Sequence, residues 1–344
     1  MHPDNLQAIL ALQSTPNAEI KDAMIIRRKP NAFKLFFVVQ GSVVPVIAPQ
    51  ILVSALVAVF ILLGTEYFPQ SIPDLTVTPF ILLGVTLSIF LGFRNRASYE
   101  RWWEARKQWG QLIIDTRSIA RQAQTYINDS HISAIQTSHS KSTPSPAKQC
   151  QRRIILLAIA FTHALRHHLR DTDCQEDIGQ FLTEEDKESL KRVQHTPNFI
   201  LKLLGDEIGT ALRDNLIGEI SARNLEERVT SMAAVLAACE RIHNTPLPFA
   251  YSLLLHRTAY IYCFTLPLGL VATLDVLTPI VTAVIAYTFF GLDALGEELE
   301  GPFGTSPHDL ALSSMSRTIE INLFEALNET DLPAQVLPEK YNLS

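Results

Sequence analysis

The sequence predicts an all-α membrane protein with a large water-exposed part. Its 344 residues are 47% hydrophobic and 19% charged, and the mean hydropathy is +0.14. These values are too apolar for an ordinary soluble domain and too charged for a bundle of membrane helices alone. Apolar residues recur at helical spacing, and the alternating pattern of strands is almost absent. The chain therefore needs both a lipid and an aqueous environment.

Four apolar stretches can span or enter a bilayer, whose hydrocarbon core takes about 20 helical residues. They are residues 43–63, 77–93, 258–274 and 277–292. Pro45 and Pro49 remove backbone donors from the first stretch, so we expect a kink or break near its start. The second stretch runs without a turn signal into a cationic and aromatic segment, which predicts one helix that passes from lipid into water.

Lysine and arginine near the ends of these stretches predict the topology. The connections 64–76 and 272–278 contain neither residue and are expected outside, whereas the flanks at 27–34 and 94–107 are basic and are expected in the cytoplasm. The predicted organisation is a cytoplasmic N-terminal segment, the first two membrane helices, a cytoplasmic helical domain, the last two membrane helices and a cytoplasmic C-terminal segment with its tail. Their residues are 1–36, 37–93, 94–250, 251–300 and 301–344.

Within the cytoplasmic part, apolar residues at helical spacing predict helices at 112–120, 154–169 and 225–239. Residues 136–148 are rich in serine, threonine and proline, which predicts a mobile surface loop. Residues 313–327 form an amphipathic pattern that Ser313 or Ser314 could cap.

Several functional classes are not supported by the sequence. A net charge of -6 gives no general basic field for a nucleic-acid partner. P-loop, nucleophile-elbow, HExxH and dinucleotide-binding motifs are absent, so neither an enzyme nor a cofactor is expected. The cysteines lie far apart without a CxxC pair, which predicts ordinary buried thiols at Cys150, Cys174, Cys239 and Cys263.

Four motifs together resemble the bestrophin family, notably its bacterial members, over roughly residues 30 to 327. They are GSV at 41–43, LGFRNRASYERWWEARKQWG at 91–110, CERIHNTPLPFAY at 239–251 and EELEGPFGTSPHDLAL at 297–312. The resemblance implies a homopentameric ion channel of a bacterial inner membrane, in which the second helix of each subunit lines a central pore.

The second apolar stretch carries the candidate pore residues. Val85, Ile89 and Phe93 are four residues apart and so share one helical face. By resemblance they form a hydrophobic neck, in which rings of apolar side chains exclude water. The alternative is a stripe that packs against a neighbouring helix.

A second constriction is expected at the cytoplasmic exit of the pore. The resemblance places Ile220 at this aperture, between Glu219 and Arg223, whose charges could bias ion passage. The alternative is a surface isoleucine on a solvated helix.

The permeant ion is left open between two predictions. Chloride is the family default, and Arg94 and Arg96 just beyond the neck would attract anions if they faced the lumen, although Glu100 would oppose them. Phe93 is the only neck residue with the positive ring edge that favours anions. A sodium-type channel for monovalent cations is therefore the alternative.

Animal family members bind calcium in an acidic loop after the fourth membrane helix. Here Glu298, Gly301 and Asp309 occupy the matching positions, but only one carboxylate follows the PFG motif. Calcium normally takes 6 to 8 oxygen ligands, so we predict no tight calcium site and no other bound metal.

A second possible metal site lies among the histidines of the cytoplasmic part. His163 and His167 are four residues apart, with His168, Asp171 and Cys174 close behind, a spacing that could bind zinc. Arg166 and Arg170 argue against a metal, so a polar exposed helix face is the preferred interpretation.

Other ionisable residues lie near the ends of the last two membrane helices. His256 and Arg257 are expected at the membrane interface, although they could mark an ion pathway. Contacts between subunits are expected for the acidic residues Asp293, Glu297, Glu298 and Glu300.

Two other classes of function remain as alternatives to a channel. A secondary transporter would require repeated halves with broken helices, and no internal repeat is visible in the sequence. A membrane-anchored cytoplasmic scaffold or enzyme would leave the face of the second membrane helix free to vary.

Overall fold

The computed structural model describes residues 38–39, 41–68, 70, 75–129 and 145–338, and the predicted N-terminal segment 1–36 lies outside them. The described residues form helices and no strand, which confirms the predicted all-α fold. In chain order the helices are α3 (Val44–Tyr67), α4 (Thr78–Tyr126), α5 (Pro146–Leu169), α6 (Gln175–Gly179), α7 (Glu184–Leu190), α8 (Thr196–Arg213), α9 (Glu219–Asn244), α10 (Phe249–Leu274), the 3-10 helix η2 (Asp275–Leu277), α11 (Thr278–Glu300) and α12 (Leu312–Ala326).

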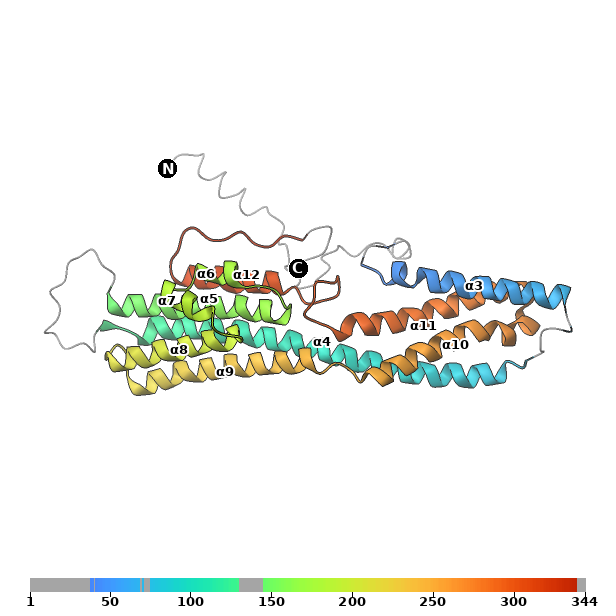
Figure 1. The fold of residues 1–344 in the computed structure, drawn as a ribbon, viewed down its shortest axis with the longest axis horizontal. Helices are drawn as coiled ribbons and strands as arrows, with labels where there is room; N and C mark the ends of the chain where they lie inside the picture. Colours follow the sequence, from blue (N-terminus) through green and yellow to red (C-terminus); the bar gives the residue numbers. More distant parts are fainter. Residues whose placement is uncertain (1–37, 40, 69, 71–74, 130–144, 339–344) are drawn as a thin grey trace, which may run out of the picture.

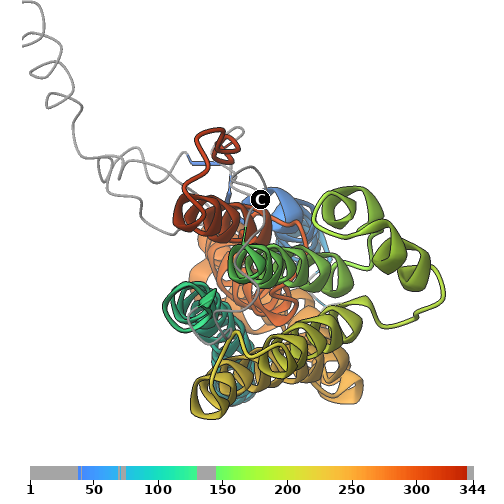
Figure 2. The ribbon, with the colours of Figure 1, turned by 90° about the vertical axis from the view of Figure 1, so that its left-hand side faces the viewer.

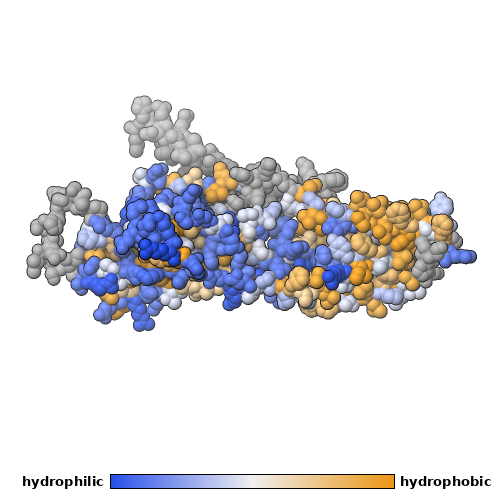
Figure 3. Space-filling model, in the orientation of Figure 1, coloured by the Kyte–Doolittle hydropathy of each residue, from blue (hydrophilic) through white to orange (hydrophobic). Residues whose placement is uncertain are grey.

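The molecule is elongated, and its two ends differ in surface chemistry (Figures 1 and 3). We call one end the apolar half; it contains α3, α10, α11 and α4 as far as Phe93. The other end, the polar half, contains the rest of α4, α5 to α9 and α12. In the view of Figure 3, apolar side chains dominate the surface of the first half and hydrophilic side chains that of the second.

Within the described residues, three stretches are long and apolar enough to cross a membrane, namely Val44–Tyr67, Thr78–Tyr126 and Phe249–Glu300. The third contains both α10 and α11, which η2 joins into an antiparallel pair (Figure 1). The four predicted apolar stretches thus correspond to α3, the first part of α4, α10 and α11. The turn between α10 and α11 lies at the same end of the molecule as the end of α3 (Figure 1).

Helix α4 connects the two halves as a single helix of 49 residues (Figure 1). It packs against α10 and α11 as well as against α5, α9 and α12. The predicted helix that continues through the border without a turn is therefore confirmed, and the orientation of its apolar part determines that of its charged part.

The polar half is built around α5, which packs against α4, α8 and α12 (Figure 2). Large side chains along α5 are completely buried, including Ile154, Leu157 and Phe161. A helix with apolar residues on several faces needs neighbours on several sides, and these neighbours form the main core.

Two helix starts differ from the prediction. α3 is continuous from Val44, because Pro45 lies in its first turn, where a missing backbone N–H costs no helical hydrogen bond, and Pro49 does not interrupt it. α12 is close to the predicted helix, but Ala311 precedes it, so neither Ser313 nor Ser314 is its cap.

The predicted surface loop 136–148 lies mostly outside the described residues, which resume at Ser145. Ser145 caps α5, since its hydroxyl accepts a hydrogen bond from the backbone N–H of Lys148 at 3.4 Å. Pro146 then occupies the first turn, where it is favourable. The last three residues assigned to the loop are therefore helical.

Candidate functional site

An exposed file of apolar side chains lies on α4 in the apolar half. Val85 is 56% exposed, Ile89 53% and Phe93 61%. Their spacing of four residues stacks the three side chains along one face of the helix. We call these three residues the apolar file. The described residues of this chain leave more than half of the surface of each uncovered.

The opposite face of α4 provides the packing contacts. Leu87 and Leu91 are buried in a cluster with residues of α10 and α11, such as Ala259 and Phe290. This packing determines the rotation of α4 and leaves the apolar file facing outward. The file is consequently not a stripe packed against another described helix of the same chain.

Arg94 follows the apolar file but points into the protein. Its guanidinium forms an ion pair with Asp293 of α11, and Glu300 Oε2 lies 3.9 Å away. The second oxygen of Asp293 lies 2.7 Å from Nδ1 of His256 on α10. One residue turns a helix by about 100°, which carries Arg94 off the face of Phe93. Arg94 therefore does not share the exposed face of the apolar file, and its expected attraction of anions depended on its facing the lumen.

Arg96 returns to the exposed face, three residues after Phe93. Its Nε donates to Glu100 Oε1 at 2.8 Å, and both side chains are exposed. Glu100 was expected to oppose the charge of Arg96, and the two side chains form an ion pair. This pair leaves little net charge next to the apolar file.

Ile220 lies at the start of α9 and is 80% exposed. This helix begins at the polar end of the molecule, far from the apolar half (Figure 1). Glu219 lies in its first turn, and Arg223 pairs with Glu227 at 3.4 Å. An isoleucine exposed at the end of the molecule opposite the apolar half is compatible with a cytoplasmic aperture. It is equally compatible with the alternative, a surface position in water.

Three of the motifs found in the sequence meet at the border between the halves. Trp102 Nε1 donates to the backbone oxygen of His308 at 3.0 Å. Arg101 donates from Nε to the backbone oxygen of Glu300 at 3.2 Å and from Nη2 to that of Ile242 at 2.6 Å. α4 is thereby joined to the end of α11 and to the end of α9.

The two acidic residues at the calcium-clasp positions, Glu298 and Asp309, already have protein partners. Glu298 Oε2 lies 3.0 Å from Nε2 of His308. The buried Asp309 accepts a hydrogen bond from the backbone N–H of Ser306 at 2.6 Å, and burial raises the pKa of its carboxyl group. Gly301 follows the last residue of α11 and brings no side-chain ligand. The absence of a tight calcium site remains a prediction, and these contacts support it.

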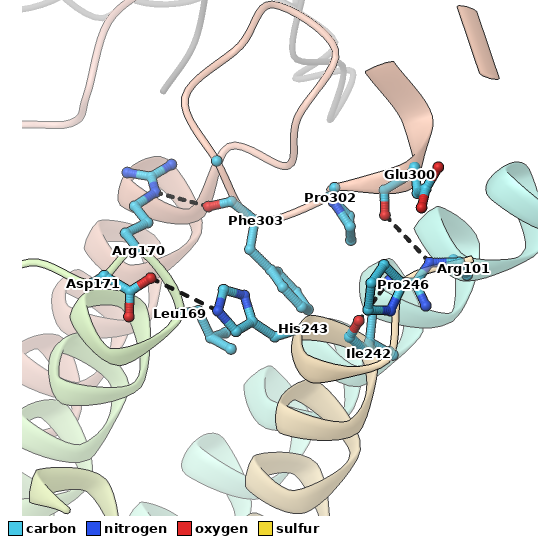
Figure 4. A pocket seen from close by; sticks show the side chains of 12 residues that line it. Arg101, Leu169, Arg170, Asp171, Ile242, His243, Pro246, Glu300, Pro302 and Phe303 are labelled. Atoms are coloured by element: carbon cyan, nitrogen blue, oxygen red, sulfur yellow. Dashed lines mark hydrogen bonds and ion pairs between the residues drawn. The ribbon is translucent and has the colours of Figure 1, made fainter. Parts of the chain in front are cut away.

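A cavity of about 390 Å³ lies beside the loop that follows α11 (Figure 4). Arg170 lines it and donates to the backbone oxygen of Phe303 at 3.2 Å, while His243 Nε2 lies 3.8 Å from Asp171 Oδ2. Arg101 and Glu300 form another side of the cavity and bind each other or nearby backbone. The cavity thus lies where the two halves meet, and most of its charged side chains already bind backbone oxygens or other side chains of the protein.

The histidines of α5 do not converge on the zinc site considered from the sequence. His163 is buried 3.1 Å from Glu320, His167 lies 2.9 Å from Asp177, and His168 lies 3.0 Å from Glu240. The interpretation of an exposed polar face is thus wrong for His163. Burial of all four cysteines as free thiols is confirmed.

Sequence reasoning missed the long-range partners of the buried charges. The acidic residues at the end of α11 were expected between subunits, but Asp293 and Glu300 contact Arg94 of the same chain. Asp115 is also buried and accepts from Ser231 Oγ at 2.6 Å. A buried charge requires a partner. Asp293 follows a long uncharged stretch, so the sequence could indicate that it needs a partner, but not that the partner is Arg94.

Comparison with known proteins gives a consistent result. The family model described as "Bacterial/Fungal Bestrophin protein" matches residues 24–325. The voltage-dependent anion channel-forming protein mll4386 of Mesorhizobium japonicum is 45% identical over 325 residues, which cover 94% of this chain and 98% of that protein. The voltage-dependent anion channel-forming protein YneE of Escherichia coli K12 is 37% identical and is covered to 99%, with 92% of this chain.

The fold is also similar to a solved structure. The crystal structure of a bacterial bestrophin homolog from Klebsiella pneumoniae superposes with a TM-score of 0.74 at 37% sequence identity. The match covers 83% of this chain and 100% of that one.

Proposed function

The chain belongs to the bacterial and fungal bestrophin family, and from this membership we propose that it forms a homopentameric channel for small monovalent ions. The observation that carries the proposal is the apolar file, which is exposed on a helix that extends through both halves of the molecule. A single chain does not enclose a pore, but five copies of α4 around an axis would bring five such files together.

The neck would consist of stacked rings of Val85, Ile89 and Phe93. Apolar rings of small diameter hold water poorly and can close a pore by dewetting without a moving plug. Ile220 would form a second apolar ring at the polar end, since α9 begins there with this side chain exposed. Ions would then cross the membrane through the neck and leave through this aperture.

We propose anions, with chloride first, as the permeant ions. Two relatives are named voltage-dependent anion channel-forming proteins, which supports this choice. The charges beside the neck give little further selectivity, because Arg94 is buried against Asp293 and Arg96 is paired with Glu100. Ring edges of Phe93 are the remaining anion-favouring groups in the neck. Selectivity for sodium is the alternative outcome of the test below.

The proposed location is a bacterial inner membrane, with both termini in the cytoplasm. Basic residues follow the apolar part of α4, whereas η2 and its neighbours contain no lysine or arginine. The end of α3 and the turn between α10 and α11 lie together at the apolar end, as this topology requires (Figure 1).

The test is a bilayer recording of the purified protein under a sodium chloride gradient. The triple variant Val85→Ala, Ile89→Ala and Phe93→Ala should widen the neck and raise the conductance several-fold. Phe60→Ala on α3 is a matched control, because this phenylalanine is also exposed on an apolar helix but lies outside the file. A reversal potential near that of chloride would support the proposed selectivity, and one near that of sodium would contradict it.

The assembly is tested separately by the mass of the protein in detergent. A mass of five chains is expected. A monomer, or a triple variant with the conductance of the control, would contradict the central pore.

A further inference from the structure

A cluster of two histidines and one glutamate lies in the polar half, away from the apolar file. His168 comes from the last turn of α5, His195 precedes α8 as its N-cap, and Glu240 lies in the last part of α9. Nε2 of His168 and Nε2 of His195 lie 3.0 and 2.6 Å from the same oxygen of Glu240, Oε1. The candidate ligand atoms all lie within 4.8 Å of one another. Three separate helix ends thus direct their polar atoms to one point.

We propose that His168, His195 and Glu240 bind a single zinc ion. Two imidazole nitrogens and one carboxylate oxygen form a donor set that zinc accepts in four-coordinate sites that keep one open position. All three side chains are partly exposed, so water can provide the fourth ligand. The site is separate from the calcium-clasp positions, and the inference does not depend on the proposed channel function.

The cations that discouraged a metal in the sequence are directed elsewhere in the structure. Arg166 pairs with Asp177. Arg170 donates from Nε to the backbone oxygen of Phe303 and from Nη1 to Ser313 Oγ at 2.9 Å. Neither guanidinium is recruited to Glu240, and the carboxylate keeps its contacts with the two imidazoles.

Zinc binding would change the position of the proton on the ring of His195. Nδ1 of His195 accepts the backbone N–H of Asn198 at 3.3 Å, so in the neutral ring the proton lies on Nε2 and points at Glu240. Zinc would take the lone pair of Nε2, and the proton would move to Nδ1 of the same ring. The N-cap bond of α8 would then be lost. Zinc and this cap are therefore alternative partners of His195, and binding would reorganise the start of α8.

Metal content of the full-length assembled protein tests the proposal. The protein would be prepared without a polyhistidine tag, stripped with a chelator, dialysed against micromolar zinc chloride and analysed for bound metal. One zinc per chain is expected. Glu240→Gln and His195→Ala should each weaken zinc binding at least about tenfold, because each removes a ligand. His243→Ala is the matched control, since it removes another partly exposed histidine paired with an acid.

Two further measurements distinguish a lost ligand from a lost fold. Cobalt chloride in place of zinc should produce the visible absorption of a tetrahedral ion in the wild type and in His243→Ala, but not in Glu240→Gln. Zinc should also raise the unfolding temperature of the wild type and leave that of Glu240→Gln, which keeps the shape of the side chain, unchanged. Equal zinc content in the ligand variants and the wild type, or no bound zinc in the wild type, would overturn the proposal.

Discussion

The apolar and polar halves differ in the large apolar side chains that they expose, because most of those exposed among the described residues lie in the apolar half. In the polar half, Phe161 is 0% exposed within a core of large aliphatic residues. In the apolar half, Phe60 is 73% exposed, whereas Ser54, Ala58 and Thr282 are completely buried between helices. Phenylalanines of the apolar half thus include exposed rings such as Phe60 as well as buried ones such as Phe290, whereas Phe161 of the polar half lies in a core.

This difference shows how each half is stabilised. In water, removal of apolar surface from solvent drives helices together. Lipid chains are as apolar as leucine, so membrane helices associate instead through close packing of small residues and through polar contacts. A Cβ on Gly269 would lie 2.3 Å from Phe80 Cδ2, and one on Gly84 would lie 2.5 Å from Tyr262 Oη. These glycines permit contacts between helices that any side chain would prevent.

The largest expected effect is a difference in unfolding free energy between two matched variants, one in each half. Phe161→Ala should lower the free energy of unfolding by about 3 to 5 kcal/mol, because it leaves a cavity in the core of the polar half. Phe60→Ala should change it little, since that ring faces outward. Unfolding followed by the fluorescence of the tryptophans, all of which lie on α4, measures both. Similar losses for both variants would contradict the different packing of the halves.

A second test concerns the border, where the two kinds of packing meet. Asp293→Asn should destabilise the protein by about 3 kcal/mol, because it removes the nearer of the two carboxylates beside the buried guanidinium of Arg94. The double variant Arg94→Met with Asp293→Leu removes both charges and should recover much of the loss. Thermal unfolding in detergent compares the three proteins. A double variant less stable than Asp293→Asn would show that the pair itself stabilises this border.

The smallest expected effect is a pH dependence from the loop at the same border. Burial raises the pKa of Asp309, so the folded protein holds this proton more tightly than the unfolded chain does. Stability should therefore fall as the pH rises from the ordinary aspartate pKa of about 4 through the raised value. Asp309→Asn cannot ionise and should remove this part of the decline. Unfolding midpoints between acidic and neutral pH measure it, and parallel profiles for the two proteins would contradict the expected contribution.

Much of the architecture could be predicted because its signals are local. The predicted stretches 43–63 and 277–292 agree with the starts of α3 and α11 to within one residue, and α12 is displaced by one residue from its prediction. The stretch predicted from residue 258 begins earlier, at Phe249, because α10 continues into a region with charged residues that hydropathy excluded. Uncharged length and helical spacing are properties of neighbouring residues, which explains why these predictions were accurate.

The candidate site could be predicted in part. The common face of Val85, Ile89 and Phe93 follows from helical periodicity alone, and the structure adds that this face is exposed because Leu87 and Leu91 pack against other helices. Periodicity also separates Arg94 from that face. It does not show which face is buried, so the sequence left open whether Arg94 faces the lumen.

The sequence by itself determined the helical class, the apolar stretches, the continuous α4 and the family. Tertiary structure alone decided the ion pair of Arg94 with Asp293, the contact of Trp102 with the loop after α11, and the cluster of His168, His195 and Glu240. Helix periodicity acts over a few residues and is visible in the chain, whereas these hydrogen bonds and ion pairs join residues 45 to 206 positions apart. Such contacts depend on how whole helices pack, and that packing is determined by the shapes of all the side chains between them.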